Sequence, residues 1–208
     1  LIPLVFALIS VFITMIIYEP VSYVTTLIGD FVQTATVYQP FIMGVVISVI
    51  MGMALTAPIS SAAIAIMISL DGLAGGAAVV GCCVQMVGFA VMSRKDNNIG
   101  TILSVGIGTS MLQFKNILKK PIIWLPTIIV SAILGPIATV VLKTKCTPVG
   151  AGMGTSGLVG PIETISAMGS NGYLSVILLM IALPIILVWL IDVIFRKYDL
   201  IKPGDLKI

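Results

Sequence analysis

The sequence has no histidine and very little charge. Asp, Glu, Lys and Arg make up 9% of its 208 residues, whereas a typical soluble domain holds about 25%. Without histidine the chain lacks the commonest general base and metal ligand, and it has no phosphohistidine carrier of its own. Hydrophobic residues make up 59% of the chain and the mean hydropathy is +1.20. Too few charges are present to cover a water-facing surface, so the composition excludes a soluble enzyme and predicts a polytopic membrane protein.

Cysteine is also scarce, with Cys82 and Cys83 adjacent in an apolar run and Cys146 far along the chain. An odd number of cysteines without CxxC spacing argues against a disulfide framework and against a metal site. We therefore expect no metal and no cofactor. The net charge of +3 is small, and we interpret it as a loop bias that sets membrane orientation, not as a nucleic-acid-binding surface.

Long apolar segments make up most of the chain and predict an all-α fold of transmembrane helices. Interruptions within these segments predict that some helices are broken and that some form re-entrant hairpins. The chain begins apolar and without Met, so we interpret it as a fragment whose earlier helices are missing. The first predicted segments are a span over 1–18 that ends at Tyr18-Glu19-Pro20, an interfacial or extracytoplasmic connection over 21–40, and an apolar segment over 41–70 broken at Thr56-Ala57-Pro58. A span over 73–92, a short amphipathic or re-entrant segment over 99–114 and a span over 121–142 kinked at Gly135-Pro136 follow. The last segments are a hairpin over 147–172, a span over 173–195 and a polar tail.

The distribution of Lys and Arg predicts the orientation. If 99–114 and 147–172 both return to their own side, only Lys143 and Lys145 of the eleven basic residues lie opposite the C-terminus. Because basic residues concentrate in cytoplasmic loops, this asymmetry predicts a cytoplasmic C-terminus.

Short stretches recur within the broken segments. Gly106–Ser110 resembles Gly152–Ser156, Gly135–Thr139 resembles Gly160–Thr164, and Thr56–Ser60 is a looser case. Paired segments interrupted by Gly or Pro indicate the binding site of a transporter, although these spacings give no single repeat period.

The stretch VGAGMGTSGLVGPIETI contains Gly152-x-Gly154-x-x-Gly157, the spacing of a dinucleotide fingerprint. No strand is expected before it, and no acidic residue follows about 20 positions on, so we exclude a nucleotide site. A solvated linker would be more polar. A hairpin buried in the protein fits best, with backbone groups available to a ligand. Its carboxylate, Glu163, is a functional candidate if it lies at membrane depth, and a helix-capping residue if it lies near the interface.

Other polar residues have structural interpretations beside functional ones. Asp71 is expected to form a polar turn, and Asp192 to pair with Arg196 four residues later. Trp124 is either a sugar-stacking ring or an interfacial anchor. Hydrogen bonds between helices explain Ser60, Ser61 and Gln85 as well as ligand contacts do.

Several ordered stretches, from about residue 41 to 195, resemble the membrane-embedded IIC component of the bacterial sugar phosphotransferase system. They are TAPISSAAIAIMISLDGLAGGAAVVGCCVQMVGFAV, GIGTSMLQFKNILKKPIIWLP, SAILGPIATVV and GAGMGTSGLVGPIET. The nearest branch includes the perfringolysin-regulator-like proteins.

The resemblance implies a single all-helical permease domain, here 1–195, with a cytoplasmic tail over 196–208 in a bacterial plasma membrane. It implies a homodimer with re-entrant hairpins that carry a carbohydrate across the bilayer for phosphorylation by a separate IIB protein. Related permeases hydrogen-bond sugar hydroxyls through a hairpin Glu. The candidate substrate-binding residues are Glu163, Thr164, Gly154, Thr155, Ser156, Ser60, Ser61 and Gln85.

This chain departs from the many relatives that place a His near the sugar, and we assign no catalytic residue. Two alternatives follow from the same residues. The first is a membrane regulator or sensor that kept the fold without transport. The second is a channel or ion-coupled transporter that uses Glu163 as a proton site.

Overall fold

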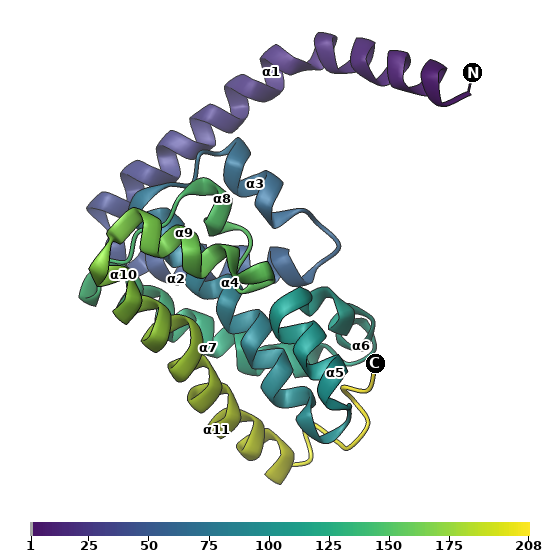
Figure 1. Cartoon of the computed structure of the whole chain (residues 1–208), viewed down its shortest axis with the longest axis vertical. Helices are drawn as coiled ribbons and strands as arrows, with labels where there is room; N and C mark the ends of the chain where they lie inside the picture. Colours follow the sequence, from purple (N-terminus) through teal and green to yellow (C-terminus); the bar gives the residue numbers. More distant parts are fainter. Residues whose placement is uncertain (1) are drawn as a thin grey trace.

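The structure, a computed structural model, describes residues 2–208, without the side chains of 2–5, 7–9, 13, 16–17 and 20–21. Within this range it is all-α, with one isolated antiparallel bridge between Gly72 and Cys146 (Figure 1). The α-helices are α1 Ile2–Tyr38, α2 Pro40–Thr56, α3 Ser61–Met67, α4 Gly72–Met92, α5 Ile99–Leu103, α6 Phe114–Lys119, α7 Leu125–Pro136, α8 Pro148–Ala151, α9 Val159–Met168, α10 Ser170–Ser175 and α11 Leu183–Lys197. Short 3₁₀ helices are η1 Ser93–Lys95, η3 Ser110–Gln113, η4 Pro121–Trp124 and η6 Ser156–Leu158, and π-helical stretches are η2 Ser104–Gly108, η5 Ile137–Val141 and η7 Val176–Ala182.

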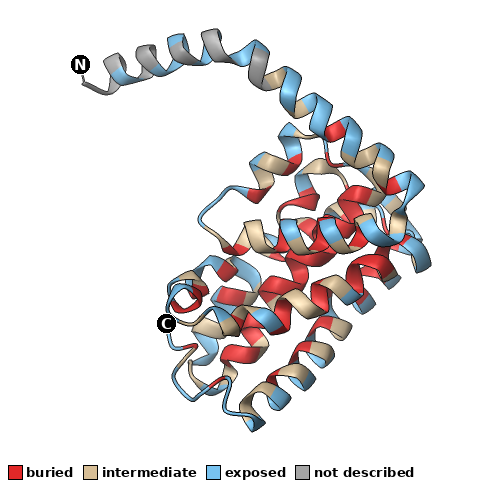
Figure 2. Ribbon diagram, turned by 180° about the vertical axis from the view of Figure 1, so that it is seen from behind, coloured by how far each residue is buried: buried red, intermediate tan, exposed pale blue. Residues whose placement is uncertain are grey.

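Helix α4 forms the centre of the molecule. Its side chains are buried on almost every face, and α2, α7 and α11 pack against it. Figure 2 shows buried residues gathered in the middle of the helical body. A helix that is apolar all round is stable only inside a protein or a membrane. The Gly- and Ala-rich segment 73–92 therefore lies inside the protein, as its continuous apolar sequence predicts.

Within the described part of the chain, three helical stretches are long and apolar enough to cross a membrane: Gly72–Lys95, Pro121–Val141 and Ser170–Lys197. They confirm the spans predicted over 73–92, 121–142 and 173–195. The predicted irregularity at Gly135-Pro136 is present as a change from α-helix to π-helix after Pro136. Proline lacks the amide hydrogen of a regular helical bond, so an irregular helix is expected next to it.

Close approach of α2 to α4 and α7 depends on glycine. A side chain at Gly81 of α4 would place its Cβ 1.9 Å from the carbonyl oxygen of Ser48 on α2. On the other side of α2, a Cβ at Gly135 of α7 would lie 2.2 Å from the carbonyl oxygen of Gly44. The Ser48 hydroxyl donates to the carbonyl of Ser131, 2.8 Å away. Small residues thus bring three helices into backbone contact, as in membrane bundles generally.

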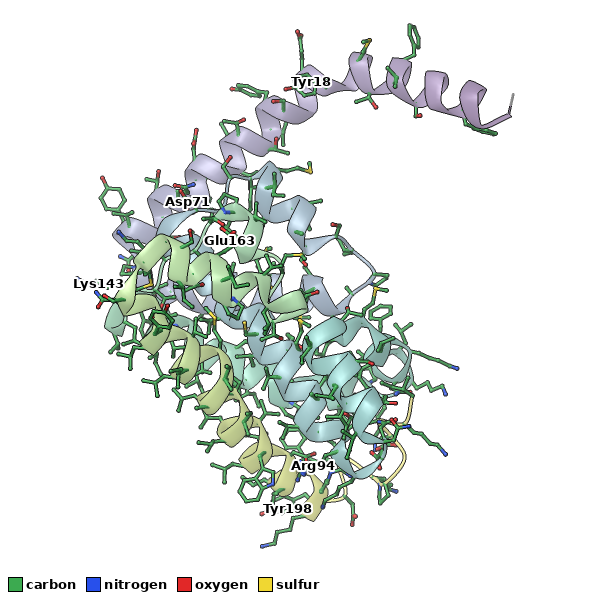
Figure 3. All side chains as sticks on the ribbon, in the orientation of Figure 1. Tyr18, Asp71, Arg94, Lys143, Glu163 and Tyr198 are labelled. Atoms are coloured by element: carbon green, nitrogen blue, oxygen red, sulfur yellow. The ribbon has the colours of Figure 1, made fainter. Side chains whose placement is uncertain are left out.

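Helix α1 differs from the sequence-based expectation. The structure has one continuous helix over Ile2–Tyr38, where we expected a span ending at Tyr18-Glu19-Pro20 and then an interfacial connection. A proline within a long apolar helix bends it without ending it when the freed backbone group finds another partner. Figures 1 and 3 show the helix changing direction close to Tyr18. Most side chains of the predicted span over 1–18 lie outside the described part of the structure.

A buried ion cluster holds α11 to the end of α4. Asp192 is fully buried and accepts from Arg196 at 3.0 Å, the predicted pairing, and from Arg94 at 3.2 Å. Arg196 also lies 3.6 Å from Asp96. The cluster neutralises a carboxylate that would be costly alone in an apolar interior.

The C-terminal tail, residues 198–208, folds back over the α5–α6 region (Figure 1). Ile201 and Leu206 are buried in the main core. The backbone carbonyl of Leu206 accepts from Asn97 at 2.7 Å and from Gln113 at 2.9 Å. The tail therefore fastens the loop after α4 to the segment that follows it.

Acidification is expected to loosen this tail through Asp205. Burial alone would raise the pKa of its carboxyl, but hydrogen bonds from Lys120, 2.6 Å away, and from the Lys202 amide outweigh it and hold the pKa below its ordinary value of 3.8. A carboxyl with a lowered folded-state pKa stabilises the fold above that ordinary value and ceases to do so as the pH falls through the folded pKa. Thermal melts from pH 7 downward should show a smaller acid-induced loss of stability in Asp205→Asn than in the unmodified chain. Identical pH profiles would exclude this contribution.

Candidate functional site

Three of the interruptions between helices in the described chain concern the candidate site, and each contains an extended or left-handed stretch. The first separates α2 from α3, where the Ser60 hydroxyl caps α3 by accepting from the amide of Ala63. The second lies at Thr109, whose backbone is extended between η2 and η3 and whose hydroxyl accepts from the amide of Met111. Capping by Ser and Thr satisfies amide groups that a helix start leaves unpaired. The sequence predicted the first interruption, at Thr56-Ala57-Pro58, whereas for 99–114 it predicted only a short amphipathic or re-entrant segment.

The third break is the glycine stretch between α8 and α9. Gly154 and Gly157 have φ of +55° and +53°, a conformation that glycine adopts without steric cost. Gly160 packs so closely on the turn that a Cβ there would lie 2.3 Å from the carbonyl oxygen of Gly154. The turn bonds several of its own amides, including Ser156 to Met153 and Gly160 to Gly154. These glycines therefore make a compact turn, and those amides are not free for a ligand.

The three breaks meet one another through hydroxyl groups. Thr56 and Ser110 share a hydrogen bond of 2.8 Å between their side-chain oxygens. Ser61 donates to the carbonyl of Gly152 at 2.7 Å, and Ser156 donates to the carbonyl of Gly108 at 2.9 Å. The stretches Gly106–Ser110 and Gly152–Ser156, whose sequences resemble one another, are thus in direct contact.

A cavity of about 190 Å³ lies at this meeting point. It is lined by residues of all three breaks and of α4, namely Leu55, Ile59, Ser60, Ser61, Ala62, Met86, Gly108, Thr109, Met111, Gly152, Met153 and Ser156. We call it the tip cavity. None of these described lining residues is charged. Its volume is several times the roughly 30 Å³ that a water molecule occupies in the liquid, so it accommodates a small neutral polar ligand.

Gln85 lies behind the breaks as a hydrogen-bond centre. Its buried side-chain oxygen accepts from the Trp124 ring at 3.0 Å and from the Thr127 hydroxyl at 2.9 Å. The Thr56 hydroxyl is a third, weaker donor at 3.4 Å. Gln85 thus ties α4 to α2 and α7, and Trp124 is anchored inside the protein by its ring nitrogen.

Glu163 lies elsewhere on the third break. Its carboxylate accepts from the Thr147 hydroxyl at 2.6 Å, and Thr147 caps the start of α8. Figure 3 shows Glu163 close to Asp71, in the half of the molecule opposite Arg94 and Tyr198. This hydrogen bond joins the residue that precedes α8 to the middle of α9. Glu163 does not line the tip cavity.

The predicted site residues therefore separate into two groups. Ser60, Ser61 and Ser156 line the tip cavity, and the Thr155 hydroxyl donates to the carbonyl of Gly106 beside it. The others, Glu163, Thr164, Gly154 and Gln85, lie outside its lining. The buried Thr164 hydroxyl has no hydrogen-bond partner among the described residues, and the Gly154 turn packs against Cys82.

Gly108 and Thr109 are cavity residues that the sequence reasoning did not select. The signal for them was the likeness between Gly106–Ser110 and Gly152–Ser156, which we interpreted only as weak evidence for a repeat.

A comparison with protein families gives a match over the whole chain. The family model described as "Phosphotransferase system, EIIC" matches residues 1–208. No curated protein and no solved structure matches the chain. The chain therefore belongs to the EIIC family, whose members are membrane permease components of the sugar phosphotransferase system.

Proposed function

We propose that this chain binds a small carbohydrate in the tip cavity and carries it across a bacterial plasma membrane, where a separate IIB protein phosphorylates it. The observation that supports this most directly is the convergence of three broken segments on one uncharged, hydroxyl-lined cavity. Broken segments that meet inside a helical bundle are the usual setting of a transporter's substrate site. The proposal includes a cytoplasmic C-terminus and assembly as a homodimer.

The chemistry of the cavity suits a neutral polyol. Each Ser or Thr hydroxyl offers one donor and two acceptor positions. Ser60 and Thr109 each accept one backbone amide hydrogen, and their own hydroxyl hydrogens remain available to a ligand oxygen. Ser61 and Ser156 use their hydrogens on backbone carbonyls and keep acceptor capacity for ligand hydroxyls. The cavity therefore offers both donors and acceptors without a charge.

Translocation requires the breaks to separate and close again. Hydrogen bonds made by single hydroxyl groups join their tips, each worth about 1 kcal/mol net. They run from Ser61, Thr155 and Ser156 to backbone carbonyls and between Thr56 and Ser110. Such contacts re-form readily after a movement, whereas the glycine-mediated packing of α2 on α4 forms a fixed core. In this proposal the phosphoryl group comes from the IIB protein.

Thermal stability in detergent against a panel of sugars and polyols tests the proposal. A ligand at a hundredfold excess over its Kd should stabilise the protein by about 2.7 kcal/mol. Gly108→Leu should abolish the response, because a Cβ at Gly108 meets no atom within 4 Å and a larger side chain can fill the cavity mouth without a clash. Gly100→Leu is the matched control, since Gly100 is exposed on the same segment and does not line the cavity.

Glu163→Gln separates the two candidate positions of the site. A sugar response that survives Glu163→Gln and is lost in Gly108→Leu supports the tip cavity. The reverse result would place the sugar at Glu163, whose role as a ligand remains a prediction. No response to any sugar in a well-folded sample would contradict carbohydrate binding and favour a regulatory protein. Uptake that depends on phosphorylated IIB, measured in vesicles, tests the transport step.

A further inference from the structure

A second cavity lies at the opposite end of the molecule from the C-terminal tail. It has a volume of about 570 Å³ and is lined by Val141, Leu142, Lys143, Lys145, Ala167, Met168, Asn171, Leu174 and Ser175. We call it the lysine pocket. Figure 3 shows Lys143 far from Arg94 and Tyr198, near the end of the molecule that also holds Glu163 and Asp71. The pocket shares no lining residue with the tip cavity.

The pocket lies where two membrane-spanning stretches end. The stretch Pro121–Val141 ends at its rim, and the stretch Ser170–Lys197 begins there. This is the depth at which phospholipid headgroups meet the hydrocarbon core.

The charge of the described pocket lining is positive. Lys143 and Lys145 both line it, and among the described residues neither ammonium group forms an ion pair with a carboxylate. No acidic residue belongs to its described lining. Asn171 adds an exposed amide, and the Ser175 hydroxyl, bonded to Thr144 at 3.1 Å, lies at its floor. These groups complement a phosphate and the hydroxyls attached to it.

Beside the polar groups the protein exposes aliphatic side chains. Val141 is 68% exposed and Leu174 is 53% exposed, and both line the pocket. Ile177, one turn further along the same span, is 58% exposed. A charged recess therefore continues into an apolar surface that runs along the membrane-spanning stretch. A free anion would use only the recess, whereas a phospholipid would use both parts.

We propose that the lysine pocket binds an anionic phospholipid, with its phosphate between Lys143 and Lys145 and its acyl chains on the aliphatic surface beside Val141 and Leu174. This site is independent of the sugar-binding proposal. A bound lipid there would contact both the loop 142–146 and the α9–α10 connection. It would therefore stabilise the third break at its end distant from the tip cavity.

The purified chain in detergent, supplied with dioleoylphosphatidylglycerol or dioleoylphosphatidylcholine, tests the proposal by native mass spectrometry and thermal stability. Phosphatidylglycerol should bind and stabilise more strongly than phosphatidylcholine. The double variant Lys143→Gln/Lys145→Gln should lower the affinity for phosphatidylglycerol about thirtyfold, since each lysine near an anionic headgroup contributes roughly a fivefold factor. Lys143→Arg/Lys145→Arg keeps the charge and should keep the binding.

Lys115→Gln/Lys119→Gln is the matched control, because it removes two exposed lysines from helix α6, outside the pocket. An equal loss of phosphatidylglycerol binding in this control would overturn the site and indicate a general charge effect. Glycerol phosphate without acyl chains should not reproduce the stabilisation. If it does so at concentrations comparable to those of the lipid, the pocket is a site for soluble anions and the lipid proposal fails.

Discussion

Replacing Asp192 by Asn is expected to destabilise the protein by about 3 kcal/mol, near the lower end of the cost of breaking a buried ion pair. Asp192 is fully buried and holds Arg94 and Arg196 at 3.2 and 3.0 Å. The amide keeps the shape of the side chain but removes the negative charge, so two guanidinium groups lose their shared counter-ion. Both retain some contact with solvent, 29% for the Arg94 side chain and 11% for that of Arg196, which limits the loss.

Unfolding by SDS in mixed micelles measures this effect, and Asp199→Asn provides a matched control. Asp199 is exposed just after the same helix, and its φ of +57° is one that Asn tolerates well. The two substitutions remove the same charge, and only Asp192→Asn should lower the unfolding free energy substantially. Equal effects would show that the buried cluster contributes no more than an exposed carboxylate does.

Gly81→Ala is expected to cost roughly 2–3 kcal/mol, the upper part of the range for overpacking a core. The added methyl group would lie 1.9 Å from the carbonyl oxygen of Ser48, which is backbone and cannot rotate away. Helix α2 would have to move off α4, and the hydrogen bond from Ser48 to Ser131 would be strained at the same time. Because α2 carries the first break, the displacement should also weaken any sugar response.

Gly100→Ala is the control for this substitution. Gly100 is an exposed residue of α5, and a Cβ there would meet only the Asn98 side-chain oxygen, at an ordinary 3.5 Å. Alanine is the better helix former, so the control should be neutral or slightly stabilising. A Gly81→Ala protein as stable as the control would contradict the close packing of α2 on α4.

Much of the helical architecture was predictable from local pattern. The continuous apolar run of 73–92 predicted a buried span, and the spacing of Asp192 and Arg196 predicted their pairing. Pro58 and the glycines after Gly152 predicted where helices would be interrupted. These features depend on hydrophobicity and on residues a few positions apart, which is the range over which sequence pattern acts. Pro20 is the exception, because α1 continues through it.

Tertiary structure alone decided which broken segments meet and which polar groups face the cavity. Ser61 and Gly152 are 91 positions apart, and Thr56 and Ser110 are 54 apart, so no local pattern relates them. The same holds for Glu163, which the sequence offered as a sugar ligand and which the fold pairs with Thr147. Glycine and small side chains let several helices approach α4 at backbone distance. That packing, more than any single motif, sets the direction of each hydroxyl, because hydrogen-bond partners in a close-packed interior are fixed by the neighbouring helix.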